Sequence, residues 1–179
     1  NGDADCPPEE RTAAQTVTIN GRDDCPIAVP DHFVTNEDVY TDPDGVKLGN
    51  KVANDIDPNG DPLSVESVSL AVDPITVTGT GPLTEANFTI TQLGNGDPEY
   101  VAGSVATFKI TVTDNTDPDG LQEIAYIYIN PNGDEFFINT DDAFNGLGKD
   151  QSVVFNFNYV VTNGDADCPP EERTAAQTV

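Results

Sequence analysis

One 17-residue segment occurs twice in this chain, letter for letter, and the duplication limits what the chain can be. The first copy spans residues 1–17 and the second spans residues 163–179, so the copies are offset by 162 positions. Self-similarity at a fixed period is the mark of repeat proteins, whose units follow one another along one axis. A unit of this size is too long for a solenoid and has the length of one globular domain. The sequence therefore predicts one full repeat and the beginning of the next, in an array that builds length.

The residue composition favours β-strands joined by tight turns. Val, Ile and Thr are abundant, and 14 Pro and 15 Gly residues supply turn positions. No segment keeps an apolar period of 3.6 residues, whereas residues 153–162 carry apolar side chains at every second position. About ten such strands, with turns roughly every 8–12 residues, predict an all-β fold of the β-sandwich class.

The strand pattern makes three further predictions. Residues 123–130 are apolar on both faces, so this strand is expected at the centre of a sheet. A slip in the alternation near Glu66 and Ser67 predicts a β-bulge. The loop 141–148 is expected to turn Phe144 and Leu147 inward. The other predicted strands are 12–20, 27–34, 47–53, 63–72, 75–78, 87–93, 104–113, 135–139 and 174–179.

The chain is strongly acidic. It has 32 Asp and Glu residues against 7 Lys and Arg, which gives a formal net charge of −25. Such a field repels nucleic acid and anionic membranes, so neither is expected as a partner. Divalent-cation sites, the solvated surface of a halophile and simple solubility are three explanations of the acidity. The concentration of Asp in Asp-Pro-Asx-Gly turns favours the first. No segment is long and apolar enough to predict membrane insertion.

Two groups of motifs carry a resemblance to known repeat families. The opening stretches 26–31, 35–38 and 53–63 resemble bacterial cadherin-like and Ig-like adhesin repeats. Residues 132–137, 143–147 and 151–165 look like the second half of VCBS-type repeats. On this reading, residues 1–20 are the last strand and loop of a preceding repeat, and residues 21–179 form one Ig-like repeat. The middle, 73–113, is unmatched and is either an insertion or a second small sandwich.

The resemblance implies a large extracellular or cell-surface array of Ig-like domains that calcium makes rigid. It implies no catalytic activity, and the residues point the same way. His32 is the only histidine, and with three cysteines no zinc cluster assembles. The chain also has no glycine-rich phosphate loop and no Gly-x-Ser-x-Gly motif. The cysteine at the repeat junction is a departure from the family pattern.

One acidic loop has the spacing of a calcium-binding site. Oxygen-bearing side chains at alternate positions converge on a hard cation, and a glycine permits the sharp bend. Helices should flank a true EF-hand, and Pro58 and Pro62 argue against helices here. We therefore expect a calcium-binding β-turn loop, with a solvated acidic turn as the alternative. The candidate ligands are Asp55, Asp57, Asn59, Asp61 and Glu66.

Two other acidic groups are candidates for calcium. Asp117 and Asp119 repeat the loop pattern in a second turn. Asp23 and Asp24 are expected to form a junction cluster with Glu37 and Asp38. Metal at a junction would stiffen the linker between domains. Without it, carboxylates within a Debye length repel one another and loosen the array.

The cysteine positions predict a disulfide within one repeat. Cys6 and Cys168 are the same position in two copies, so each repeat contributes that cysteine and Cys25. An intervening strand separates Cys6 from Cys25 by about 30 Å, and no disulfide spans that distance. A hairpin of residues 153–162 and 174–179 instead brings Cys168 to the end where Cys25 lies. Cys25–Cys168 is therefore expected, with Cys6 bonded to the preceding repeat. Free thiols and an inter-chain bond are the alternatives.

Two functions remain in view. The first is a structural repeat of a filament, stalk or giant adhesin whose partners are neighbouring copies, joined head to tail or by strand exchange, in which residues 12–20 complete a neighbour. The second is an adhesin module that binds a carbohydrate or another surface ligand. Its only hint is a set of threonines that could share one face: Thr76, Thr78, Thr89 and Thr91.

Overall fold

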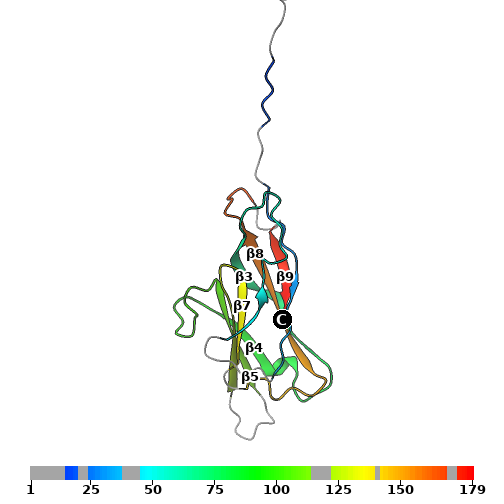
Figure 1. Cartoon of the computed structure of the whole chain (residues 1–179). Coiled ribbons are helices and arrows are strands. Elements are labelled where there is room, and N and C mark those ends of the chain that lie inside the picture. Colours follow the sequence, from blue (N-terminus) through cyan, green and yellow to red (C-terminus); the bar gives the residue numbers. More distant parts are fainter. Residues whose placement is uncertain (1–14, 20–23, 38–44, 114–121, 140–141, 169–172) are drawn as a thin grey trace, which may run out of the picture.

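The computed structural model describes residues 15–19, 24–37, 45–113, 122–139, 142–168 and 173–179. Two β-sheets pack face to face in a sandwich (Figure 1), so the predicted all-β fold is confirmed. The only helical element in these ranges is one 3₁₀ turn, η2 (Glu85–Asn87). None of the described elements is a helix long and apolar enough to cross a membrane.

The first sheet has four strands in the order β1-β9-β8-β3. Its centre is the antiparallel hairpin of β8 (Ser152–Thr162) and β9 (Thr174–Thr178). β3 (Ser64–Thr78) pairs antiparallel with β8, and the short β1 (Asp31–His32) pairs parallel with β9. The predicted strand 27–34 is thus reduced to two residues plus one bridge between Ile27 and Ile56. Pro26 and Pro30 lack the N–H that a longer ladder would need.

The second sheet has five strands in the order β2-β7-β6-β5-β4. They are β2 (Val46–Asn50), β7 (Asp134–Asn139), β6 (Gln122–Ile129), β5 (Ala106–Thr113) and β4 (Phe88–Leu93). β6 is the middle strand, which confirms the prediction for 123–130. Its residues Ala125, Ile127 and Ile129 are fully buried, while Tyr128 stacks on Phe136 on the outer face.

β3 is longer than the sequence predicted and decides how the middle of the chain folds. The predicted bulge is confirmed by a register shift between Val65 and Ser67. A second shift lies between Leu70 and Ile75, so the predicted strands 63–72 and 75–78 are one irregular strand. Residues 73–113 therefore supply the end of β3, η2, β4 and β5, and they do not form a second small sandwich.

The core lies between the sheets and is centred on the inward side chains of β8. Phe157 and Tyr159 are fully buried, and Phe155 nearly so. Phe157 packs on Phe108 of the opposite sheet, with ring centroids 4.6 Å apart. Phe144, from the loop before β8, contacts Phe155 at 6.2 Å. Residues 144 and 147 turn inward as predicted, so this loop closes one end of the core.

Candidate functional site: the end of the sandwich that holds the second copy

The second copy of the repeated segment builds β9. This strand pairs with β8 from Val160 opposite Thr174 to Asn156 opposite Thr178. Ala175 and Gln177 are buried, whereas Thr174 and Ala176 are exposed and Thr178 is partly covered. Two backbone bonds between Val179 and Phe155, of 2.7 and 2.9 Å, continue the ladder. The repeated sequence is therefore an inner strand of the four-stranded sheet.

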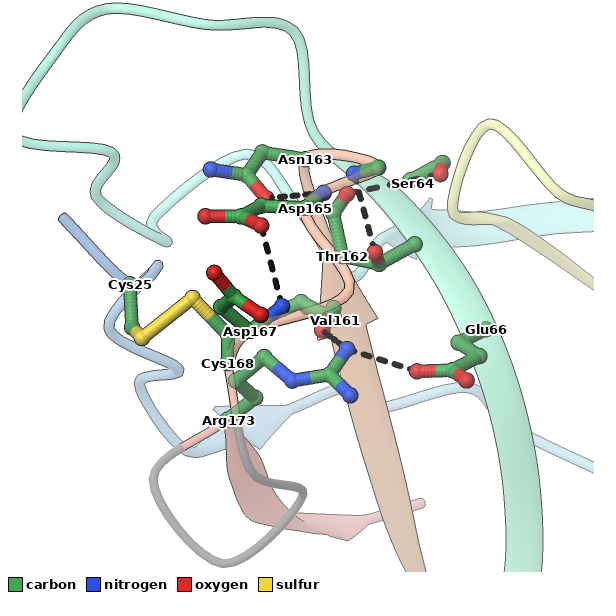
Figure 2. A network of polar contacts seen from close by, with 11 residues as sticks. Cys25, Ser64, Glu66, Val161, Thr162, Asn163, Asp165, Asp167, Cys168 and Arg173 are labelled. Atoms are coloured by element: carbon green, nitrogen blue, oxygen red, sulfur yellow. Dashed lines mark hydrogen bonds and ion pairs between the residues drawn. A yellow bond between two sulfur atoms is a disulfide. The ribbon is translucent and has the colours of Figure 1, made fainter. Parts of the chain in front are cut away.

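The first half of the second copy forms a compact polar turn, which Figure 2 shows. Asn163 Oδ1 accepts the Asp165 N–H at 3.0 Å, and Asp165 Oδ1 accepts the Asp167 N–H at 2.9 Å. The Thr162 hydroxyl accepts the N–H of Gly164, whose φ of 92° favours glycine. Such side-chain-to-backbone bonds fix a tight bend in a polar sequence. The bend directs Cys168 back toward the sandwich.

Cys168 forms a disulfide with Cys25, which confirms the prediction from the strand directions. The two Cα atoms are 5.3 Å apart, and Cys168 is buried. The bond ties the start of the domain to the second copy across 143 residues of sequence (Figure 2). Cys6, predicted to bond to a preceding repeat, lies outside the described residues.

Arg173 anchors the start of β9. Its guanidinium Nη1 donates to the Val161 carbonyl at 2.8 Å and forms an ion pair with Glu66 at 2.6 Å (Figure 2). The arginine is buried, whereas half of the Glu66 side chain is exposed. Glu66 was predicted as the last calcium ligand of the acidic loop. In the structure it lies in β3 and is paired with Arg173 instead.

The acidic loop itself is a tight turn around Asp57. Asp57 Oδ1 accepts the N–H groups of Asn59 at 2.9 Å and Asp61 at 3.0 Å, and Gly60 has a left-handed φ of 82°. The bond from the Asp61 N–H is the main cause that lowers the pKa of Asp57, followed by the Asn163 amide and the other turn N–H groups. Asp57 is therefore a charged carboxylate at neutral pH. The glycine bends the loop as the sequence predicted.

Three segments meet at this end of the sandwich. Asn163 of the second copy donates to Asp57 Oδ2 at 3.0 Å. The Asp24 N–H, next to the disulfide, donates to Asn59 Oδ1 at 3.0 Å. The start of the domain, the acidic loop and the second copy are thus joined at one junction. This brings Asp24 close to the loop, although the sequence had placed them in separate clusters.

Asp55 faces a different environment from Asp57. Its Oδ1 accepts the Val29 N–H at 2.7 Å and the Tyr159 hydroxyl at 3.3 Å. Burial is the main cause that raises the pKa of Asp55. Its other oxygen is buried and has no hydrogen-bond partner among the described residues. Asp55 therefore forms its hydrogen bonds toward the interior of the sandwich, whereas Asp57 and Asp61 lie at the junction.

The other predicted metal ligands are not gathered in one place. Asp23, Asp38, Asp117 and Asp119 lie outside the described residues. Glu37 lines a pocket with Gln151 at the start of β8, whereas Asp24 lies near Asn163, just past its end. A strand of this length spans about 33 Å, so Glu37 does not join Asp24. Within the described ranges, no group of three or more His, Cys, Asp or Glu residues is placed to hold a metal ion.

The structure also contains a buried polar cluster that the sequence analysis missed. Lys51 and Glu135 form an ion pair in which neither side chain is exposed. Gln177 of the second copy donates to Glu135 Oε2 at 2.5 Å, and Lys51 Nζ lies 5.1 Å from the Tyr159 ring centroid. The repeated segment therefore contributes a side chain to the centre of the domain. In a short predicted strand, nothing local distinguishes Lys51 from a surface lysine.

The threonines proposed as a binding face do not share one sheet. Thr76 and Thr78 lie in β3 of the four-stranded sheet, whereas Thr89 and Thr91 lie in β4 of the five-stranded sheet. The strand aromatics of β8 are core residues. The four threonines therefore do not share one sheet face, and the buried β8 aromatics are not available for stacking on a sugar.

Comparison with known proteins gives one family. The family model described as "Bacterial Ig domain" matches residues 23–117, just over half of the chain. No match was found among curated proteins or among solved structures. The matched region starts at the disulfide junction and includes the acidic loop, β3, β4 and β5. Domains of this family are typically structural or adhesin-type repeats rather than enzymes. The match, the two-sheet sandwich and the motifs of the acidic loop agree, and the chain belongs to the bacterial Ig domain family.

Proposed function

We propose that this chain is a structural repeat of an extracellular filament, stalk or large adhesin. Neighbouring units join head to tail, and the repeated segment is the strand that leads from one unit to the next. The observation that carries the proposal is that residues 174–179 of one copy form an inner strand, whereas the described residues of the other copy, 15–17, are exposed.

The contrast can be followed residue by residue. Gln177 is 1% exposed and contacts Glu135, whereas its counterpart Gln15 is exposed. Val179 packs against the core, whereas its counterpart Val17 is 72% exposed. Residues 15–19 lie beyond the end of the sandwich, as an extended segment (Figure 1). Since identical residues are stable in β9, the first copy is suited to the same position in a neighbouring unit.

Two arrangements satisfy this proposal. In a continuous chain, each copy completes the unit before it and then leads into the next. In an assembly of separate subunits, the first copy of one subunit replaces β9 of another, which is strand exchange. Both arrangements place the disulfide and the acidic loop at the junction. An extracellular location is consistent with the Cys25–Cys168 disulfide, because such bonds persist in oxidising compartments.

The proposal is tested on two consecutive repeats produced as one chain. Small-angle scattering should give a maximum dimension close to twice that of one repeat, with an unchanged cross-section. An Ala175→Asp substitution in the shared segment should unfold the preceding unit, because Ala175 is buried. Ala176→Asp is the matched control, because Ala176 faces outward. Two units packed side by side, or equal effects of the two substitutions, would contradict the proposal.

We further propose that calcium stiffens the junction. The supporting observation is that hydrogen bonds join the acidic loop, which carries Asp57, Asn59 and Asp61, to the backbone of Asp24 beside the disulfide. Oxygen donors of this kind suit Ca²⁺, and these carboxylates repel one another without a cation. Asp23, the neighbour of Asp24, is a further candidate. The ion would supply positive charge between segments that are joined by the disulfide and by hydrogen bonds.

The calcium proposal is tested by thermal unfolding with calcium and with a chelator. Calcium should raise the melting temperature of the chain, and Asp57→Asn should reduce that rise. Asp97→Asn is the control, because Asp97 is an exposed acid that accepts the Gly94 N–H within its own loop. A melting temperature that does not respond to calcium would remove this part of the proposal while leaving the shared strand untouched.

A further inference from the structure

β9 covers only part of the length of β8. Its last backbone bonds join Val179 to Phe155, although β8 begins three residues earlier, at Ser152. On the other side of β9, the chain after β1 continues in the same direction: the Phe33 N–H donates to the Thr178 carbonyl at 3.0 Å. Past Val179, residues 33–37 and 152–154 therefore flank a gap one strand wide.

This gap is a pocket with a volume of about 450 Å³, and its lining is mainly apolar. Val179 lies at one end, the side chains of β8 form one wall, and the segment after β1 forms the other. Phe137 and Phe144 lie at its base, from the opposite sheet and the loop before β8. The pocket is thus continuous with the core at the point where β9 stops.

The register of β9 specifies what would enter this pocket. In the repeat, Val17 is followed by Thr18, Ile19 and Asn20. Because Val179 is opposite Phe155, the next three residues of an extended β9 would face Val154, Val153 and Ser152 in turn. Side chains alternate along a strand, so the second residue after Val179 points inward as Val179 does. That residue is the equivalent of Ile19.

We propose that this pocket is the docking site for residues 18–20 of the adjacent repeat, with Ile19 as the anchor. This inference rests on the shared strand proposed above and extends it from six residues to nine, 12–20. Ile19 is 90% exposed in the described segment 15–19, and the pocket offers it apolar contacts from β8, from the segment after β1 and from Phe137 and Phe144. The two flanking residues would face solvent, which suits the polar side chains of Thr18 and Asn20.

The backbone favours the same occupant. An added strand would pair antiparallel with the start of β8 and parallel with residues 33–36, so it would continue two existing ladders. A nine-residue donor from a second copy would therefore make every contact that residues 174–179 make and three residues of further pairing.

The test extends the chain itself by three residues, Thr-Ile-Asn, after Val179. Burial of one isoleucine side chain should raise the folding equilibrium constant by about 10-fold to 100-fold. Hydrogen exchange should also slow at the amide of Val153, which points into the gap because N–H groups alternate along a strand and the Phe155 N–H already bonds to Val179. An extension of Thr-Asn-Asn is the matched control for the anchor, and Lys-Ile-Asn is the control for an outward position. The first should give little stabilisation, whereas the second should keep most of it.

Three outcomes would overturn the docking site. The first is equal stability of the Ile and Asn extensions. The second is unchanged exchange at the Val153 amide. The third is a small apolar molecule, seen by native mass spectrometry on the unextended chain, that the extension does not displace. None of these outcomes affects the two-repeat scattering experiment. If the two-repeat chain is elongated as expected but the Thr-Ile-Asn extension does not stabilise the fold, the proposed function stands. Only the docking of residues 18–20 is then rejected.

Discussion

Lys51 Nζ and Glu135 Oε2 lie 2.7 Å apart in the interior of the sandwich, and neither side chain has any exposed surface. Burial lowers the pKa of Lys51 and raises the pKa of Glu135, and in each case the partner's charge acts in the opposite direction. The pair is surrounded by the rings of Phe157 and Tyr159. Each charge is therefore tolerated because the other is present.

Removing one member of this pair should destabilise the fold strongly. Lys51→Met would leave an uncompensated Glu135, and breaking a buried pair costs about 3–5 kcal/mol. Glu135→Leu should have an effect of similar size. The double variant should recover most of the loss, because an apolar pair of similar volume needs no partner charge. Urea unfolding of the three variants measures this directly. A double variant as unstable as the sum of the single ones would contradict the argument.

Breaking the disulfide should lower stability by an amount set mainly by the length of the chain it closes. For a separation of 143 residues, the chain-entropy relation gives about 5 kcal/mol. We expect Cys25→Ser with Cys168→Ser to shift the urea midpoint to much lower concentration. Cys6→Ser is the control and should leave the midpoint unchanged. A midpoint that does not respond to reductant would mean that the thiols are not joined in solution.

The stability of the fold should depend on the protonation of Asp31. Burial is the main cause that raises the pKa of Asp31 above its usual 3.8, against the lowering effect of the Tyr159 hydroxyl and of Lys51. The folded state therefore holds this proton more tightly than the unfolded state does. The resulting stabilisation is complete below the unfolded pKa and is lost as the pH rises through the folded pKa.

Asp31→Asn keeps the group neutral and should flatten the rise in stability that occurs as the pH falls through the raised folded pKa of Asp31 toward 3.8. Asp134→Asn is the matched control. The Asn50 amide, at 2.7 Å, and then Lys47 lower the pKa of Asp134. The stabilisation that Asp134 contributes is present above pH 3.8, its unfolded pKa. It is lost as the pH falls through the folded pKa, which lies below that value. Urea denaturation at a series of pH values measures the free energy of unfolding of both variants. If this free energy depends on pH in the same way for Asp31→Asn and for the parent chain, the role given to Asp31 is refuted.

The two ends of the Arg173–Glu66 pair should differ in their importance. Arg173 is buried and also binds the Val161 carbonyl, whereas half of the Glu66 side chain is exposed. Glu66→Gln should therefore cost less than about 1 kcal/mol, since exposed pairs are weak. Arg173→Met removes a charged hydrogen-bond donor and should cost about 1.5–3 kcal/mol. Equal losses in thermal unfolding would show that the ion pair, rather than the buried donor, fixes the start of β9.

Local patterns predicted the parts of the fold that depend on nearby residues. The alternation in β8, the bulge at Glu66, the inward loop residue Phe144 and the central position of β6 all follow from side-chain period and turn chemistry. The disulfide was predictable as well, because strand directions set which ends of the domain meet. The errors in predicted strand length lay at β1, which Pro26 and Pro30 shorten, and at β3, which continues through Pro74.

The sequence by itself determined the repeat, the β-sandwich and the Cys25–Cys168 bond, because duplication, side-chain period and strand direction can be read from the letters. Only the tertiary structure decided that Lys51 meets Glu135, that Glu66 pairs with Arg173, and that Asp55 faces the interior while Asp57 faces the junction. The two ion pairs join residues about 80 or more positions apart in the sequence. Asp55 and Asp57 are only two positions apart, and yet they lie in different environments. The physical reason is that burial fixes each partner, and burial depends on how the two sheets pack rather than on any local pattern.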